Sequence, residues 1–157
     1  MDKAKQKNVK LVFPVDYVTA NEFSNDAKIG YATDKDGIPD DCQGLDCGKE
    51  SNQIFRDEIM KAKTIVWNGP PGVFEFSNFA NGTKSLLQAV IDATAKGATS
   101  IIGKQFRKCF CFLFLGGGIK KNLNVGMLYE TTQPNAWGIG LLLCLLRLIF
   151  YTHYNGA

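Results

Sequence analysis

Histidine is almost absent from this chain, and its cysteines form no metal-binding pattern. His153 is the only histidine, and the closely spaced pair Cys109 and Cys111 has no second pair to complete a site. A structural zinc site needs four Cys or His ligands, usually as two spaced pairs, so zinc is not expected here. The five cysteines are odd in number and irregularly spaced. This usage is typical of free thiols in a reducing cytosol.

The chain also lacks a charge excess and a membrane-length apolar run. Its formal net charge is only +3 over 157 residues, and no Lys/Arg run forms a patch, so nucleic acid is not an expected partner. The polar N-terminus contains no signal-peptide pattern. The apolar run Trp137 to Tyr151 is shorter than the roughly 20 residues of a membrane span and contains Arg147. We therefore predict a cytoplasmic, single-domain protein that does not bind membranes.

Residues 8–103 alternate between strand and helix patterns, which predicts an α/β fold with parallel strands and flanking helices. The predicted strands are 9–13, which continues after a break at 14–18, then 64–67 and 98–102. The predicted helices cover about 51–62 and 78–96. Residues 20–48 are rich in Asn, Asp, Gly and Lys and are interpreted as loop.

Capping and periodicity signals in the sequence support the prediction of both helices. Ser51 is a candidate N-terminal cap for the first helix, and Phe55, Ile59 and Ala62 fall on one face of it. The second helix is apolar at three- and four-residue steps, and Gly97 is expected to end it.

Residues 104–157 follow neither period. An unbroken apolar run from Cys109 to Leu115 precedes three glycines, and residues 119–136 mix Lys, Asn, Thr and Gln. The apolar run from Trp137 comes next. The sequence therefore predicts an irregular apolar C-terminal tail.

The most informative stretch runs from Thr64 to Glu75, TIVWNGPPGVFE. A short buried strand ends there in a Pro/Gly turn, and ligands of parallel α/β sheets bind just beyond the carboxyl ends of strands. Asn68 offers an amide at this crevice, and Glu75 offers a carboxylate that can accept hydrogen bonds from a sugar diol. Taken alone, the turn can also be only a turn, and Glu75 can be a surface carboxylate or a helix N-terminal acid.

Together with other motifs, this stretch resembles phosphoglycerate kinase. The motifs, in order, are VFPVDYVTA (12–20), GIP (37–39), GLDCG (44–48), the 64–75 run and FANGT (79–83). The resemblance covers residues 2–103 and implies part of that family's C-terminal, nucleotide-binding domain, with a partial Rossmann-like parallel sheet. Residues 104–157 form a tail outside the family pattern.

The resemblance implies ATP or ADP with Mg²⁺ as ligands, phosphoryl transfer between ADP and 1,3-bisphosphoglycerate in glycolysis, and a monomeric protein. It assigns three sets of residues. The adenine pocket is lined by Gly44, Leu45 and Val73. The loop near the phosphates consists of Asn68, Gly69 and Pro70. Glu75 matches the acid that binds the ribose hydroxyls.

The family pattern breaks after Gly103. The family continues there with further glycines and Asp-Thr, its phosphate and magnesium element, whereas this chain continues with Lys104-Gln105-Phe106. The Mg²⁺ site is therefore predicted to be lost. The family's N-terminal domain and its phosphoryl-facing lysine also have no counterpart in this sequence. Asp16 and Asp46 are interpreted as local turn acceptors, and no catalytic residue is assigned.

Three functions remain open at this point. The chain can be a phosphoglycerate kinase, an inactive remnant with weak or no nucleotide binding, or a fragment that binds a membrane or partner through the apolar run from Trp137. Arg147 and the lack of a polar face disfavour the third.

Overall fold

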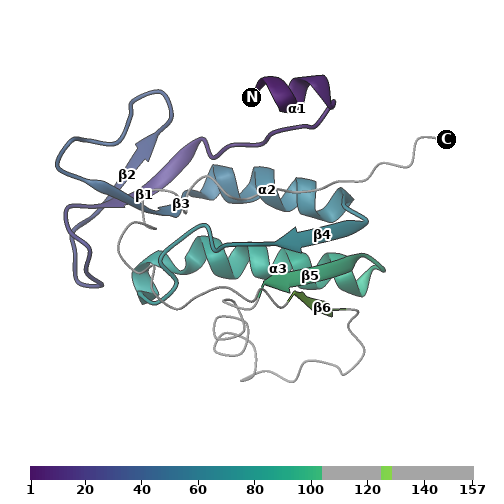
Figure 1. Cartoon of the computed structure of the whole chain (residues 1–157). Helices are drawn as coiled ribbons and strands as arrows, with labels where there is room; N and C mark the ends of the chain where they lie inside the picture. Colours follow the sequence, from purple (N-terminus) through teal and green to yellow (C-terminus); the bar gives the residue numbers. More distant parts are fainter. Residues whose placement is uncertain (104–124, 129–157) are drawn as a thin grey trace.

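The computed structural model describes residues 1–103 and 125–128, which form two small sheets with helices against them (Figure 1). The first sheet is antiparallel, with strand order β2-β1-β3, and the second is parallel, with strand order β4-β5-β6. The predicted α/β class is confirmed. The elements are α1 (Asp2–Gln6), β1 (Asp16–Ala20), β2 (Ile29–Thr33), β3 (Gln43–Cys47), α2 (Lys49–Lys61), β4 (Thr64–Trp67), the 3-10 turn η1 (Ser77–Phe79), α3 (Asn81–Ala95), β5 (Thr99–Gly103) and β6 (Val125–Leu128).

The antiparallel sheet corrects the interpretation of residues 20–48 as loop. β2 and β3 both lie in that range and pair with β1 on either side. The polar composition concealed them because β2 is an edge strand that buries only Ala32, while Tyr31 is 80% exposed. Gly30 lies close to β1, and a side chain there would be too near it, because a Cβ would lie 2.8 Å from Thr19 Oγ1.

The parallel sheet confirms the predicted strands at 64–67 and 98–102. β4 and β5 pair in parallel, with Thr64 aligned to Thr99. β6 adds a third parallel strand on the other edge of β5. Within the predicted irregular tail, Val125–Leu128 form this short strand, where backbone pairing with β5 outweighs a weak local pattern. The remainder of that prediction lies outside the described residues.

The predicted strand at 9–13 is wrong, because this segment belongs to neither sheet. It runs along α2 instead. Lys10 forms an ion pair of 2.9 Å with Glu58 of α2, and Val12 packs against the main core. Pro14 has no N–H to donate to a ladder, and the strand begins only at Asp16, within the predicted continuation at 14–18. Three apolar side chains of the segment are exposed: Val9, Leu11 and Phe13.

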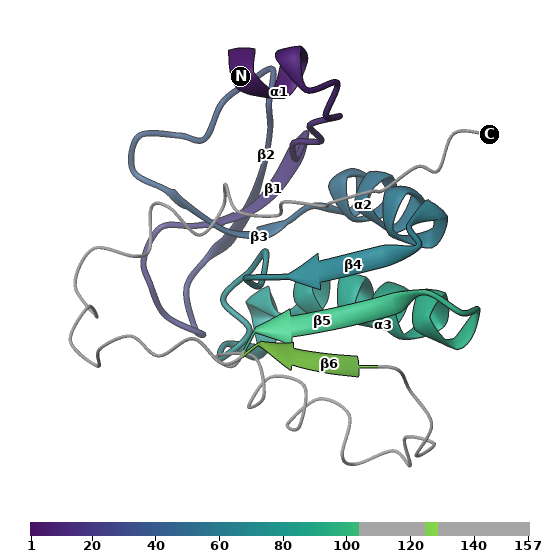
Figure 2. The same cartoon turned by 45° about the vertical axis from the view of Figure 1, so that its right-hand side comes forward.

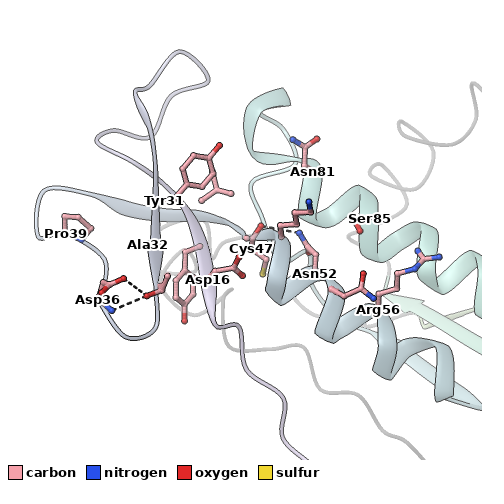
Figure 3. Close-up of a pocket in the computed structure, with 17 residues that line it drawn as sticks. Asp16, Tyr31, Ala32, Asp36, Pro39, Cys47, Asn52, Arg56, Asn81 and Ser85 are labelled. Carbon is pink, nitrogen blue, oxygen red and sulfur yellow. Dashed lines mark hydrogen bonds between the residues drawn. The ribbon is translucent and has the colours of Figure 1, made fainter.

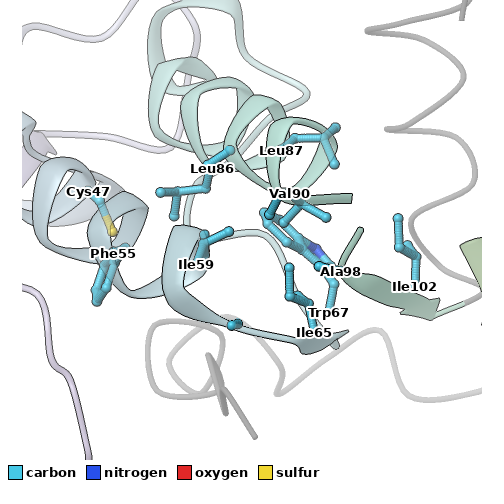
Figure 4. Packing of buried hydrophobic residues seen from close by; sticks show 13 residues of the cluster. Cys47, Phe55, Ile59, Ile65, Trp67, Leu86, Leu87, Val90, Ala98 and Ile102 are labelled. Atoms are coloured by element: carbon cyan, nitrogen blue, oxygen red, sulfur yellow. The ribbon is translucent and has the colours of Figure 1, made fainter. Parts of the chain in front are cut away.

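The main core lies between the helix pair α2–α3 and the parallel strands β4 and β5 (Figures 2 and 4). Phe55 and Ile59 are 2% and 0% exposed, and Ala62 is also buried, which confirms the predicted face of the first helix. Leu86 and Val90 meet them from α3. Each such large apolar side chain contributes about 1.5–3 kcal/mol when it is fully buried. In the described part of the chain, no helix is long and apolar enough to cross a bilayer.

The observed helix boundaries are close to the predicted ones, but Ser51 does not cap the first helix as predicted. Gly97 ends α3 with a φ of +105°, a conformation that favours glycine. α2 begins at Lys49 rather than Ser51, and its cap comes from another strand. The Asp16 carboxylate accepts hydrogen bonds from the N–H groups of Glu50 and Ser51 at 3.0 and 2.7 Å. The Ser51 hydroxyl instead accepts hydrogen bonds from the backbone N–H groups of Val15 and Asp16.

Candidate functional site

The backbone of β3 is joined to the loop that follows β4. Val73 N donates a hydrogen bond of 2.9 Å to Leu45 O. Leu45 is 3% exposed and forms a small core with Phe79, against which Val73 packs. Two residues that the resemblance assigns to one apolar wall are therefore adjacent. Gly44 precedes Leu45 on β3, is half-buried and lies opposite Thr19 of β1.

The loop after β4 lies at the carboxyl edge of the parallel sheet. Asn68 follows the last residue of β4 and is exposed. Its Oδ1 lies 3.9 Å from the position that a Cβ on Gly103 would take, so the ends of β4 and β5 meet here. Gly69 has open space around its Cα, and Pro70 is half-buried. An exposed amide and an open backbone are what an approaching phosphate requires.

Glu75 lies in the turn between this loop and η1. Its side chain is exposed, and within the described ranges it forms no hydrogen bond or ion pair, so both oxygens can accept from a ligand. The turn itself is anchored on the β1–β2 connection. Phe76 packs on Phe23 with ring centroids 4.9 Å apart, and the Asn78 amide donates to Asn25 O at 2.7 Å. Leu45, which is hydrogen-bonded to Val73, follows Gly44 on β3, and Val73 lies two residues before Glu75 in the loop. That Gly44 and Glu75 themselves come close together stays a prediction.

Asp46 has a role that the sequence interpretation missed. Its Oδ2 accepts from Gly82 N at 2.7 Å, 36 residues away, and its Oδ1 accepts from Cys47 N at 2.9 Å. Asp46 and Asp16 therefore cap the N-termini of α3 and α2, and their interpretation as local turn acceptors is wrong. The available signal was that neither helix supplies a cap of its own, because Ala80 and Gly48 occupy the cap positions.

The Asp46 carboxyl is electrostatically unusual. Burial raises its pKa to about 6, although the two backbone donors, Gly82 and Cys47, partly offset this effect. Burial also raises the pKa of the neighbouring Cys47 thiol to about 12, with further contributions from the charges of Asp46 and Asp16. The Cys47 thiol is therefore neutral at physiological pH. Cys42 and Cys47 are free thiols, as predicted, and the other cysteines lie outside the described residues.

A separate pocket of about 850 Å³ opens between the antiparallel sheet and the two helices (Figure 3). It is lined by β1 and β2 residues such as Tyr17 and Tyr31, and by Asn52 and Arg56 of α2. None of the predicted site residues lines it. The Arg56 guanidinium forms an ion pair with the Asp92 carboxylate, with Nη2 and Oδ2 2.8 Å apart. Across residues 1–103 and 125–128, no group of three or more His, Cys, Asp or Glu side chains could hold a metal ion.

Comparisons with known proteins agree on one family. The family profile "Phosphoglycerate kinase" matches residues 1–106. "Phosphoglycerate kinase 2" of Rhizopus niveus is 71% identical over 101 residues, which cover 64% of this chain and 24% of that protein. "Phosphoglycerate kinase" of Yarrowia lipolytica is 64% identical over 103 residues, covering 66% of this chain and 25% of that protein.

A solved structure shows the same similarity. The phosphoglycerate kinase from Coxiella burnetii superposes with a TM-score of 0.69 at 34% identity, over 80% of this chain and 30% of that one. The chain spans about a quarter of the length of the curated relatives it matches. Sequence and structure together place this chain in the phosphoglycerate kinase family.

Proposed function

We propose that this chain binds adenine nucleotide, ADP or ATP, at the carboxyl edge of its parallel sheet. The observation that carries the proposal is the hydrogen bond from Val73 N to Leu45 O. It holds the apolar end of β3 against the loop that bears the free Glu75 carboxylate. An apolar wall beside a carboxylate at a strand end suits an adenine base and its ribose diol.

The remaining roles follow the family resemblance. Gly44 completes the apolar wall, and Asn68 with the backbone of Gly69 and Pro70 lies beside the phosphates. A phosphate-bound Mg²⁺ would supply charge neutralisation. Its family ligand, the Asp of the Asp-Thr pair, has no counterpart after Gly103, where Lys104 follows. We propose that the protein acts as a cytosolic monomer.

Phosphoryl transfer depends on positioning and on neutralising the charge of the transferred group. The Asp-Thr element, which follows this strand in the family, is replaced here by Lys104-Gln105-Phe106. We therefore propose that this polypeptide on its own binds nucleotide weakly and transfers no phosphoryl group. A full phosphotransferase activity is the alternative function.

Calorimetric titration with Mg-ADP and a coupled phosphoglycerate kinase assay test both parts. We expect weak binding that Glu75→Ala abolishes and that Asp57→Asn, which changes an exposed carboxylate on α2, leaves unchanged. Micromolar binding that survives Glu75→Ala would refute the site assignment. Turnover near that of an intact kinase would refute the inactive-remnant proposal and establish the alternative.

A further inference from the structure

We infer that Asp46 is a positioning residue for the proposed nucleotide loop, and that uptake of a proton between Asp46 and Asn52 moves this loop and weakens nucleotide binding. The inference rests on the proposed function. The buried Asp46 carboxyl group contacts three separate elements.

Asp46 is at the junction of β3, the loop after β4 and the start of α3. It is 1% exposed. Its two oxygens accept from Gly82 N of α3 and from Cys47 N of its own strand. Its strand neighbour Leu45 accepts the hydrogen bond from Val73 of the loop. A shift of this carboxyl group therefore moves the strand, the helix start and the loop relative to one another.

Two glycines allow the chain to pass directly over the carboxyl group. A Cβ on Gly72 would lie 2.2 Å from Asp46 Oδ1, and a Cβ on Gly82 would lie 2.3 Å from the same atom. Gly72 N also donates to Thr83 Oγ1 at 3.3 Å, so the loop is bound to α3 as well. The loop backbone is therefore packed closely against the carboxyl group, so a shift of one disturbs the other.

Asn52 of α2 provides an acceptor for an added proton. Its Oδ1 is buried and has no hydrogen-bond partner among the described residues. The amide is oriented by its Nδ2, which donates to Cys47 O at 3.3 Å. A Cβ on Gly82 would lie 3.2 Å from this Oδ1 as well as 2.3 Å from Asp46 Oδ1, so both oxygens lie beside the same point. Two buried acceptors in this arrangement repel each other unless a proton lies between them.

The surroundings of Asp46 favour protonation. Burial raises its pKa to about 6, which strengthens proton binding about a hundredfold over the ordinary value of 3.8. The Cys47 thiol stays neutral, and Asp16 on β1 is bound to the start of α2. Lys49 and Glu50 at the start of α2, Glu75 on the loop and Lys84 on α3 are exposed. Farther along the two helices, the half-buried charges are paired: Arg56 with Asp92, and Glu58 with Lys10 and Lys61.

Protonation changes the hydrogen bonds at this junction. The ionised carboxyl accepts two backbone donors, whereas the protonated form donates the O–H of Oδ1 toward Asn52 Oδ1. A protonated Oδ1 accepts more weakly from Cys47 N, and its movement toward Asn52 displaces Gly72, which lies against the same oxygen. Because Gly72 leads directly to Val73 and Glu75, the apolar wall and the ribose acceptor move with it.

The test follows backbone amide shifts by NMR in the full chain from about pH 4 to 8. We expect the amides of Gly72, Val73 and Gly82 to titrate together with a midpoint near 6. The midpoint should disappear in Asp46→Asn and fall in Asn52→Ala, which removes the acceptor. Asp16→Asn is the matched control, because it removes the equivalent cap from α2 and should leave the midpoint unchanged.

Nucleotide affinity is the second measurement. Mg-ADP should bind about fivefold more weakly at pH 5 than at pH 7.5, which is at the low end of couplings between linked sites. Asn52→Ala should move this dependence to lower pH. If the amides titrate as expected but no nucleotide binds at any pH, the proposed function fails and the proton site stands. Amide shifts that stay flat, or a midpoint unaffected by Asn52→Ala, would overturn the inference.

Discussion

Replacing Gly72 by alanine places a methyl group where the structure has no room for one. The new Cβ would lie 2.2 and 2.6 Å from Oδ1 and Cγ of Asp46 and 2.7 Å from the backbone oxygen of Phe79. Ordinary van der Waals contacts begin at 3.4 Å. The carboxyl would have to move by about 1 Å, but hydrogen bonds to Gly82 N and Cys47 N hold it.

The cost of this substitution has two parts. Overpacking a rigid site costs about 1–3 kcal/mol, and weakening a hydrogen bond to an ionised group costs about 1.5–3 kcal/mol. These overlap, so we expect the free energy of unfolding to fall by about 3 kcal/mol. In a domain of about 100 residues, this corresponds to a decrease in Tm of more than about 10 °C.

Gly69 provides a matched control in the same loop. A Cβ on Gly69 would meet no atom within 4 Å, so Gly69→Ala should change stability by less than about 0.5 kcal/mol. Urea unfolding followed by circular dichroism, with thermal melts in parallel, compares the two variants. If both variants unfold within about 0.5 kcal/mol of each other, the argument that the loop rests on the Asp46 carboxyl is wrong.

Three further predictions concern the core, the buried acid and the surface. Phe55→Ala should cost about 3–5 kcal/mol in urea unfolding because it empties a fully buried site, whereas a cost below 1 kcal/mol would contradict the described core. Because the pKa of Asp46 is raised to about 6, its proton contributes stability that is present below pH 4 and lost as pH rises to 6. This loss, about 3 kcal/mol, should appear in wild type and be absent from Asp46→Asn. Arg56→Ala should cost less than about 1 kcal/mol, since its ion pair with Asp92 is partly exposed.

Strong local patterns were sufficient to predict part of the fold. β4, β5, α2 and α3 were predicted close to their observed bounds. Their apolar residues repeat at the period of the element, and Gly97 ends α3 as its sequence position suggests. The antiparallel strands were not predictable in this way, because β2 buries only Ala32. An edge strand that faces solvent leaves little periodic signal in the sequence.

The segment at 9–13 shows the opposite failure. Its short apolar run is typical of a strand, yet the segment packs along α2 and pairs with neither sheet. A short apolar run is compatible with a strand, whereas strand pairing depends on whether another strand lies alongside. That second condition is a property of the tertiary structure.

In the candidate site, too, the sequence predicted some features and only the tertiary structure showed the others. The sequence by itself predicted the loop after β4 and, through its motifs, determined the family, while the site roles of Leu45, Val73 and Glu75 stay predictions. Only the tertiary structure showed that Val73 hydrogen-bonds to Leu45 and that Asp46 caps a helix 36 residues away. Local sequence encodes the conformation of each segment, because propensity and periodicity act over a few residues. The partner of a buried polar group is decided by which segments meet once the core has formed.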